Sequence, residues 1–190
     1  MTQELIDLKN SILEGRYADA LAIVDELEGM SKQAILRNIQ AYLRILLIHL
    51  IKNQVEQRLT GSWANSIRNS IREIKKLNIK DNKTSYYINL NEWENLIEEE
   101  VIEDAIADAS EEVMNGAYNQ FQLAEMVDRN QLIQTALKFL VLTYSYSPKR
   151  MSEKFLDGIF CHSERNEVER RIPIFRYGWR CNTWLLLRWA

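Results

Sequence analysis

His49 is the residue whose type and position first suggest chemistry. It stands beside Leu47 and Leu50 in an apolar run, and Lys52 follows three residues later. An imidazole titrates near neutral pH, so it could act here as a base or a ligand. A lone histidine near an apolar face is more often a hydrogen-bonded core residue, and no Ser-His-Asp order, glycine-rich phosphate loop or HExxH motif accompanies it. We therefore predict no catalytic residue, and keep an enzyme with a site near His49 as an alternative.

One group of carboxylates has a spacing at which two of them could reach the same metal ion. Its members are Glu99, Glu100, Glu103 and Asp104. Dimetal sites in helical bundles also need Glu-x-x-His pairs, and neither His49 nor His162 follows a glutamate by three residues. Cys161, His162 and Cys181 have no spacing typical of zinc sites. The sequence predicts neither a metal nor a cofactor.

Basic and acidic side chains are segregated along the chain. A basic stripe on one predicted helix consists of Arg68, Arg72, Lys75 and Lys76. No Lys or Arg occurs between Thr84 and Asp128. Within that stretch, residues 92–112, called here the acidic segment, carry ten carboxylates: Glu92, Glu94, Glu98, Glu99, Glu100, Glu103, Asp104, Asp108, Glu111 and Glu112.

This segregation has two interpretations. The basic and acidic helices could be neighbours that pair across their junction, each exposed pair contributing about 0.2–1 kcal/mol. Alternatively, the acidic helix docks a basic partner, or the basic stripe contacts phosphate. Charge reversal of Arg68 and Arg72 should destabilise the fold only in the first case.

The element that must position these residues is a long apolar helix beginning at Ser31, which could cap it, and stopping at Thr60-Gly61. Its apolar stripe has helical spacing and comprises Ile35, Ile39, Tyr42, Leu43, Leu46 and Leu50. About 28 residues give roughly 42 Å, enough to contact every other element of a small domain. Arg44 and His49 interrupt the apolar run, so we expect no membrane span.

Other segments have helical periodicity too, and Gly and Pro, at six and two residues, are scarce. Further helices are predicted over residues 2–13, 15–30 with an end at Gly29, 62–78 with Ser62 as cap, 91–115, and two pieces of 119–142 with Asn130 capping the second. With 46% apolar residues, the chain can bury one good core. We predict an all-α, single-domain helical bundle around one long central helix, spanning residues 1–150.

The character of the chain changes after Met151. Residues 155–190 contain both cysteines, three of the five tryptophans and six arginines. The run CHSERNEVERR resembles a translated intergenic repeat, which suggests a frameshift or a fused extension. We expect residues 151–190 to form a poorly ordered, Arg- and Trp-rich tail.

Three blocks of sequence carry a family resemblance. They are ELEGM at 26–30, LLIHLIK at 46–52, and Ser62-Trp63 followed by SIR at 66–68. As a set, over about residues 2–147, they resemble the bacterial domain-of-unknown-function family 29, common in cyanobacteria. The resemblance implies an all-helical domain without an assigned activity. It places a shared site where the long helix ends and the Trp63 helix begins, with the candidate binding residues His49, Lys52, Trp63 and Arg68, to which the basic stripe adds Arg72.

Charge and composition narrow the possible functions. A net charge of −3 argues against a general nucleic-acid binder, since such binding needs a basic surface or a strong basic patch. Two cysteines, the lack of a signal peptide and the lack of an apolar 20-mer predict a cytoplasmic protein without a membrane partner. We expect a protein-interaction or regulatory module whose contact surface is the acidic helix. The alternative is a nucleic-acid-linked or antitoxin-like protein that uses the basic stripe.

Overall fold

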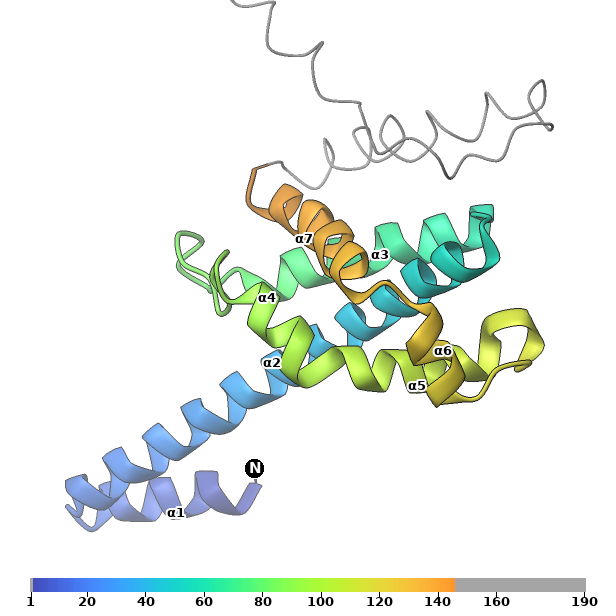
Figure 1. The fold of residues 1–190 in the computed structure, drawn as a ribbon. Helices are drawn as coiled ribbons and strands as arrows, with labels where there is room; N and C mark the ends of the chain where they lie inside the picture. Colours follow the sequence, from blue (N-terminus) through green and yellow to red (C-terminus); the bar gives the residue numbers. More distant parts are fainter. Residues whose placement is uncertain (1, 146–190) are drawn as a thin grey trace, which may run out of the picture.

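The computed structural model describes residues 2–145, which form helices joined by short connections (Figure 1). The elements are α1 (Thr2–Leu13), α2 (Tyr17–Glu56), α3 (Gly61–Asn78), α4 (Trp93–Leu96), the π-helical η1 (Ile97–Val101), α5 (Ile102–Glu112), the 3₁₀ turn η2 (Val113–Asn115), α6 (Gln120–Met126) and α7 (Arg129–Ser145). Ile79 and Tyr86 form the one isolated β-bridge of the described residues. The predicted all-α class with one long central helix is confirmed, and the predicted tail lies outside the described residues.

The central helix is longer than predicted. α2 runs without interruption for 40 residues, so the predicted helix end at Gly29 and cap at Ser31 are wrong. A glycine in a helix interior costs only about 0.5–1 kcal/mol relative to alanine, and strong helix formers such as Leu27, Glu28 and Met30 flank it. Local propensity therefore carries the helix through Gly29.

Replacing Gly29 with alanine is expected to raise the free energy of unfolding by about 0.5–1 kcal/mol, since the methyl group restricts the unfolded chain. Gly15 is the matched control: an added Cβ meets nothing within 4 Å at either position, but Gly15 has a φ of +73°. Gly15→Ala should destabilise by about 1 kcal/mol. Urea denaturation of both variants checks this, and a destabilised Gly29→Ala protein would show that α2 breaks there.

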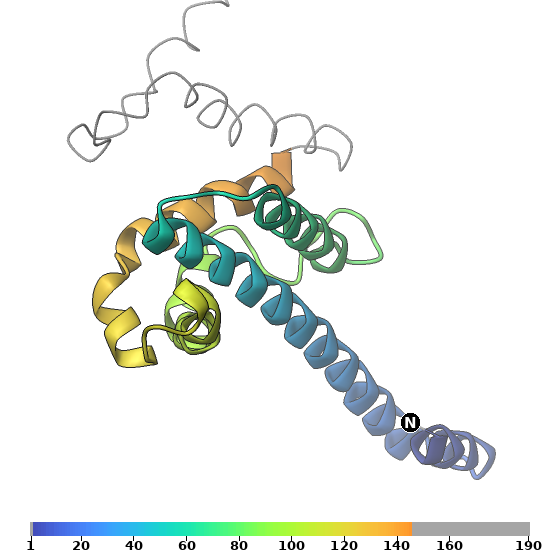
Figure 2. The ribbon, with the colours of Figure 1, turned by 90° about the vertical axis from the view of Figure 1, so that its right-hand side faces the viewer.

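The core surrounds the C-terminal half of α2. α3 folds back over this half, while α5 and α7 cover its remaining sides (Figures 1 and 2). Fully buried side chains from these helices include Leu43, Leu46, Leu47, Ile51, Ile67, Ile71, Ile74, Ile102, Ile106 and Leu140. The N-terminal half of α2 and α1 project from this body as a helical hairpin.

The acidic segment follows one helical path that changes its winding. The predicted regular helix over residues 91–115 is α4, η1, α5 and η2 in succession. Trp93, Ile97, Val101 and Ile102 are all buried. Because a π turn accommodates one extra residue, the path shifts its register here, and both Val101 and Ile102 lie in the core.

Helix starts are set by residues just outside the helices. The Thr60 hydroxyl, rather than that of Ser62, accepts from the backbone N of Trp63 at 3.2 Å. Thr60 has extended backbone angles, so α3 already begins at Gly61 and Ser62 lies inside it. Likewise Asp128, not Asn130, accepts from the backbone N of Gln131 at 3.0 Å at the start of α7.

A buried polar network joins α3, α4 and α7. Asn78 forms two hydrogen bonds with the backbone of Ile88. Its Oδ1 accepts from the Ile88 N–H at 2.7 Å, and its Nδ2 donates to the Ile88 carbonyl at 2.9 Å. The Tyr144 hydroxyl accepts from Trp93 Nε1 at 2.6 Å and donates to the Ile88 carbonyl at 2.7 Å. This network pins the loop between α3 and α4 over the core.

α2 is long and apolar enough, by length and composition, to cross a membrane, with 39% of its most apolar window buried. The core helix of a soluble protein meets the same criteria. The expected lack of a membrane partner therefore stays a prediction.

Candidate functional site

The predicted binding site lies where α2 ends and α3 begins. His49, Lys52 and Glu56 follow one another at spacings of three and four residues and share one side of α2. The turn after α2 is tight: Gln57 adopts a left-handed conformation with a φ of 52°, and Asn53 Nδ2 donates to the Arg58 carbonyl at 3.0 Å. This turn returns the chain so that the first turn of α3 lies against the last turns of α2.

Trp63 is the centre of this cluster. Its side chain is buried, and the His49 ring is stacked on it with centroids 6.4 Å apart and planes at 26°. Lys52 Nζ lies 4.7 Å and Arg58 Cζ 5.1 Å from a Trp63 ring centroid, which is within the range of cation–π attraction. The structure therefore brings together three of the five predicted site residues, and adds Arg58.

Two carboxylates complete the cluster. Glu112 Oε2 pairs with Lys52 Nζ at 2.7 Å, where the Lys52 side chain is only 10% exposed. Glu56 accepts from the backbone N of Met114 at 3.1 Å and pairs with Arg58 at 2.6 Å, with its side chain 4% exposed. These contacts tie the end of α2 to the end of α5.

Sequence reasoning missed Glu56 and Arg58. The one available signal was a carboxylate in the last turn of α2, where the helix dipole disfavours negative charge. Such a residue requires a compensating donor, and Met114 and Arg58 provide it.

Burial first, and the charge of Lys52 second, lower the pKa of His49, while Glu112 partly opposes them. Burial raises the pKa of Glu56, but the hydrogen bonds from Met114 and Arg58 and the charges of Arg58 and Lys52 outweigh it and leave that pKa below its ordinary value. At neutral pH the cluster thus holds a neutral imidazole at His49 and an ionised carboxylate at Glu56. His49 Nδ1 is buried and has no hydrogen-bond partner among the described residues.

We expect the fold to lose stability as the pH falls through the unfolded-state pKa of His49. The pKa of His49 is lower in the folded protein than in the unfolded chain, so the unfolded chain takes up a proton first as the pH falls. The neutral imidazole therefore contributes stability at pH values above the unfolded-state pKa of about 6.5. His49→Gln should flatten this part of the pH dependence, measured by urea denaturation between pH 8 and 5, a window set by the reference pKa of about 6.5. An unchanged slope in the variant would contradict the lowered pKa.

Within residues 2–145, no contact joins Arg68 or Arg72, the other two predicted site residues, to this cluster. Arg68 Nη1 donates to Asn65 at 2.8 Å within α3, and Arg72 is half-buried. Lys75 is buried and donates to the Thr143 carbonyl, and burial lowers its pKa. Lys76 is exposed and pairs with Glu73 at 2.6 Å. The predicted basic stripe is therefore not a continuous exposed surface.

The acidic segment pairs with α2 and α7 rather than with α3. Arg44 of α2 lies 3.6 Å from Asp104 and 3.2 Å from Asp108. Arg129 of α7 lies 2.5 Å from Glu103. The interpretation in which the acidic segment and the basic stripe pair with each other is thus wrong, because packing places other cations beside the carboxylates.

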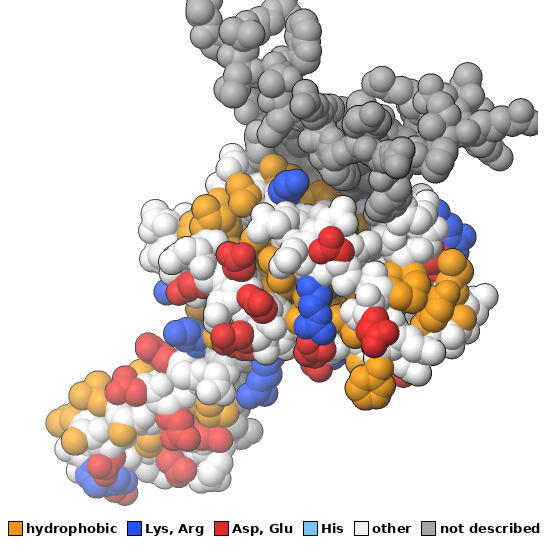
Figure 3. Space-filling model, viewed as in Figure 1, with side chains coloured by type: hydrophobic (Ala, Val, Ile, Leu, Met, Phe, Trp, Pro, Cys, Tyr) orange, Lys and Arg blue, Asp and Glu red, His pale blue; other side chains and the backbone are white. Residues whose placement is uncertain are grey.

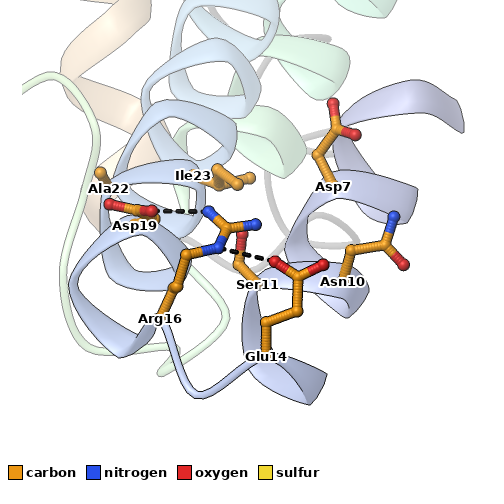
Figure 4. A pocket seen from close by; sticks show the side chains of 8 residues that line it. All are labelled: Asp7, Asn10, Ser11, Glu14, Arg16, Asp19, Ala22 and Ile23. Carbon is orange, nitrogen blue, oxygen red and sulfur yellow. Dashed lines mark hydrogen bonds and ion pairs between the residues drawn. The ribbon is translucent and has the colours of Figure 1, made fainter.

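An open hollow of about 470 Å³ lies between α1 and the first turns of α2 (Figure 4). Arg16 occupies its rim and pairs with Glu14 at 2.8 Å and with Asp19 at 2.6 Å. These pairs fix the turn between the two helices. In the described part of the chain, no group of three or more His, Cys, Asp and Glu side chains is arranged to hold a metal ion.

The chain matches no protein-family model, no curated protein and no solved structure. The family resemblance noted above therefore stays a prediction.

Proposed function

We propose that this protein is an interaction module that binds a basic segment of a partner protein with its acidic segment. The observation that carries the proposal is a surplus of exposed negative charge. Of the ten carboxylates in the segment, the described ion pairs engage four: Glu103, Asp104, Asp108 and Glu112. The other six, all exposed, are Glu92, Glu94, Glu98, Glu99, Glu100 and Glu111. Figure 3 shows acidic side chains spread over this face.

Such a surface attracts cationic partners. Several like charges on one face raise the local concentration of an oppositely charged ligand and speed its association. Buried residues such as Trp93, Ile97 and Ile106 anchor the inner side of the segment to the core, so the exposed carboxylates are carried by a packed helical path. Binding to this face would need little ordering of the protein itself.

Apolar anchors lie next to this surface. α6 packs against α5 and leaves Phe121 73% and Met126 47% exposed. Interfaces gain most of their affinity from a few large apolar or aromatic contacts surrounded by polar ones. A partner segment with Lys or Arg beside an apolar residue would match this combination.

The two alternative functions have less support. Binding of nucleic acid through the basic stripe would need accessible cations, and of its four members only Lys76 is exposed. An enzyme near His49 would need an accessible imidazole, and this ring is half-buried and stacked on Trp63.

A comparison of two triple variants tests the proposal. One replaces Glu94, Glu98 and Glu99 with glutamine. The matched control removes the same charge elsewhere, through Asp25→Asn, Glu26→Gln and Asp81→Asn, all at exposed positions. Each full-length protein is used to capture partners from lysate of the source cell, with and without nuclease, and bound proteins are identified by mass spectrometry.

We expect a nuclease-resistant partner that binds the wild type and the control, and is lost from the Glu94, Glu98 and Glu99 variant. Capture of that partner should weaken as salt increases, since exposed charges are screened. Equal capture by both variants would overturn the use of the acidic segment. Recovery that vanishes with nuclease would support the nucleic-acid alternative.

A further inference from the structure

The helical hairpin formed by α1 and the first half of α2 has its large apolar side chains on the outside. Ser11 and Ala20, 2% and 6% exposed, are the buried residues of its contact. By contrast, Leu13 is 73%, Tyr17 68% and Leu21 65% exposed. Leu5, Ile6 and Ile12 add exposures of 55%, 48% and 51%. Two helices whose fully buried residues are small, with several large apolar side chains exposed, lack the second layer that normally covers such a face.

Four of these side chains, Leu5, Ile12, Tyr17 and Leu21, lie by helical spacing on the face opposite the polar hollow of Figure 4. Asp7, Glu14 and Asp19 line the hollow. Leu5 and Ile12 each precede a hollow residue of α1 by two positions, which at about 100° per residue places them about 160° around the helix. Tyr17 and Leu21 stand two positions on either side of Asp19 and are displaced by the same angle. Near the turn of the hairpin, one face thus carries carboxylates and the other carries large apolar side chains, while Glu28, seven residues after Leu21, lies farther along the apolar side.

We propose that this apolar face packs against the same face of a second copy of the chain, forming a four-helix bundle. A twofold axis brings identical patches together, so an apolar face is self-complementary while the acidic hollows turn outward, away from each other. This arrangement covers Leu5, Ile12 and Leu21 and leaves the carboxylates of the hollow facing solvent.

The area of the face suits a dimer. α1 is about 18 Å long and the projecting part of α2, to Ile35, is about 28 Å, each about 10 Å across. The face of each copy thus has a projected area on the order of 450 Å², and its accessible surface area is larger because the side chains make it uneven. Two copies would bury on the order of 1,000 Å², which is near the lower bound for a specific interface.

Charge favours a second copy over a lipid surface. Residues 2–37 contain seven Asp and Glu and four Lys and Arg. An acidic hairpin is repelled by anionic headgroups, whereas helices that bind the membrane surface are typically rich in Lys and Arg.

The test measures the mass of the full-length protein by sedimentation equilibrium up to about 100 µM, a range that detects dissociation constants in the micromolar range. One variant carries Ile12→Glu and Leu21→Glu. The matched control carries Leu90→Glu and Val141→Glu, at exposed apolar positions outside the hairpin. Hydrogen exchange of residues 2–35 is compared at low and high protein concentration.

We expect wild type and control to reach twice the chain mass of 22.4 kDa, and the hairpin variant to self-associate at least tenfold more weakly. Amides of residues 2–35 should become more protected with concentration, a result that does not depend on any variant. A wild type that stays monomeric would overturn the proposal. So would a dimer that the hairpin variant retains, or a monomer whose hairpin instead binds vesicles of anionic or neutral lipid.

Discussion

Replacing Trp93 with alanine is expected to lower the free energy of unfolding by about 3–5 kcal/mol, as large-to-small substitutions of buried aromatic residues do. Trp93 is fully buried and is the first residue of α4. Removing the indole leaves a cavity. It also removes the Nε1 donor, which lies 2.6 Å from the Tyr144 hydroxyl that accepts its hydrogen bond. Urea denaturation followed by circular dichroism measures the loss.

Two further variants separate the causes. Phe121→Ala removes an aromatic ring that is 73% exposed and should change stability by no more than about 0.5 kcal/mol. Trp93→Phe keeps most of the apolar volume but not the hydrogen bond, and should cost about 1–2 kcal/mol. A Trp93→Ala protein as stable as Phe121→Ala would show that α4 is not anchored in the core.

The second large effect is expected for Asn78→Leu, which should lower the free energy of unfolding by about 2–3 kcal/mol. Asn78 is 1% exposed, and its Oδ1 accepts from the backbone N of Ile88 at 2.7 Å. Leucine has a similar size but cannot accept, so the Ile88 N–H is left buried without this partner. Leaving a buried N–H without an acceptor lowers stability by more than the net free energy that one hydrogen bond contributes to folding.

Asn69→Leu is the matched control on the same helix. Asn69 is exposed, so this substitution should change stability by no more than about 0.5 kcal/mol. Asn78→Leu combined with Tyr144→Phe should cost less than the sum of the two single changes, because Asn78 Nδ2 also donates to the Tyr144 hydroxyl at 3.0 Å. Additive losses would show that these groups do not act as one network.

The candidate site was partly accessible from the sequence. The resemblance and the spacing of His49 and Lys52 along one helix directed attention to the junction with Trp63, and these three side chains do meet. Arg68 and Arg72 were added to the site, but they lie five and nine residues beyond Trp63 along α3. A rise of about 1.5 Å per residue carries them away from the end of α2.

The sequence by itself determined the helices and most of the core, because a repeat of 3.6 residues is a local property that one segment displays without its neighbours. The ends of helices were less well determined. Gly29 is a weak helix-stop signal, and the strong helix formers on both sides of it extend α2 through this position.

Only the tertiary structure decided which charges meet. Arg44 lies 60 residues before Asp104, and Arg129 lies 26 residues after Glu103, yet both form ion pairs with the acidic segment. The burial of Lys75 and the exposure of Leu13 and Leu21 were likewise invisible in their own helices. Pairing and burial depend on how helices pack against one another, and that is set by the summed fit of many distant side chains rather than by the spacing within any one segment.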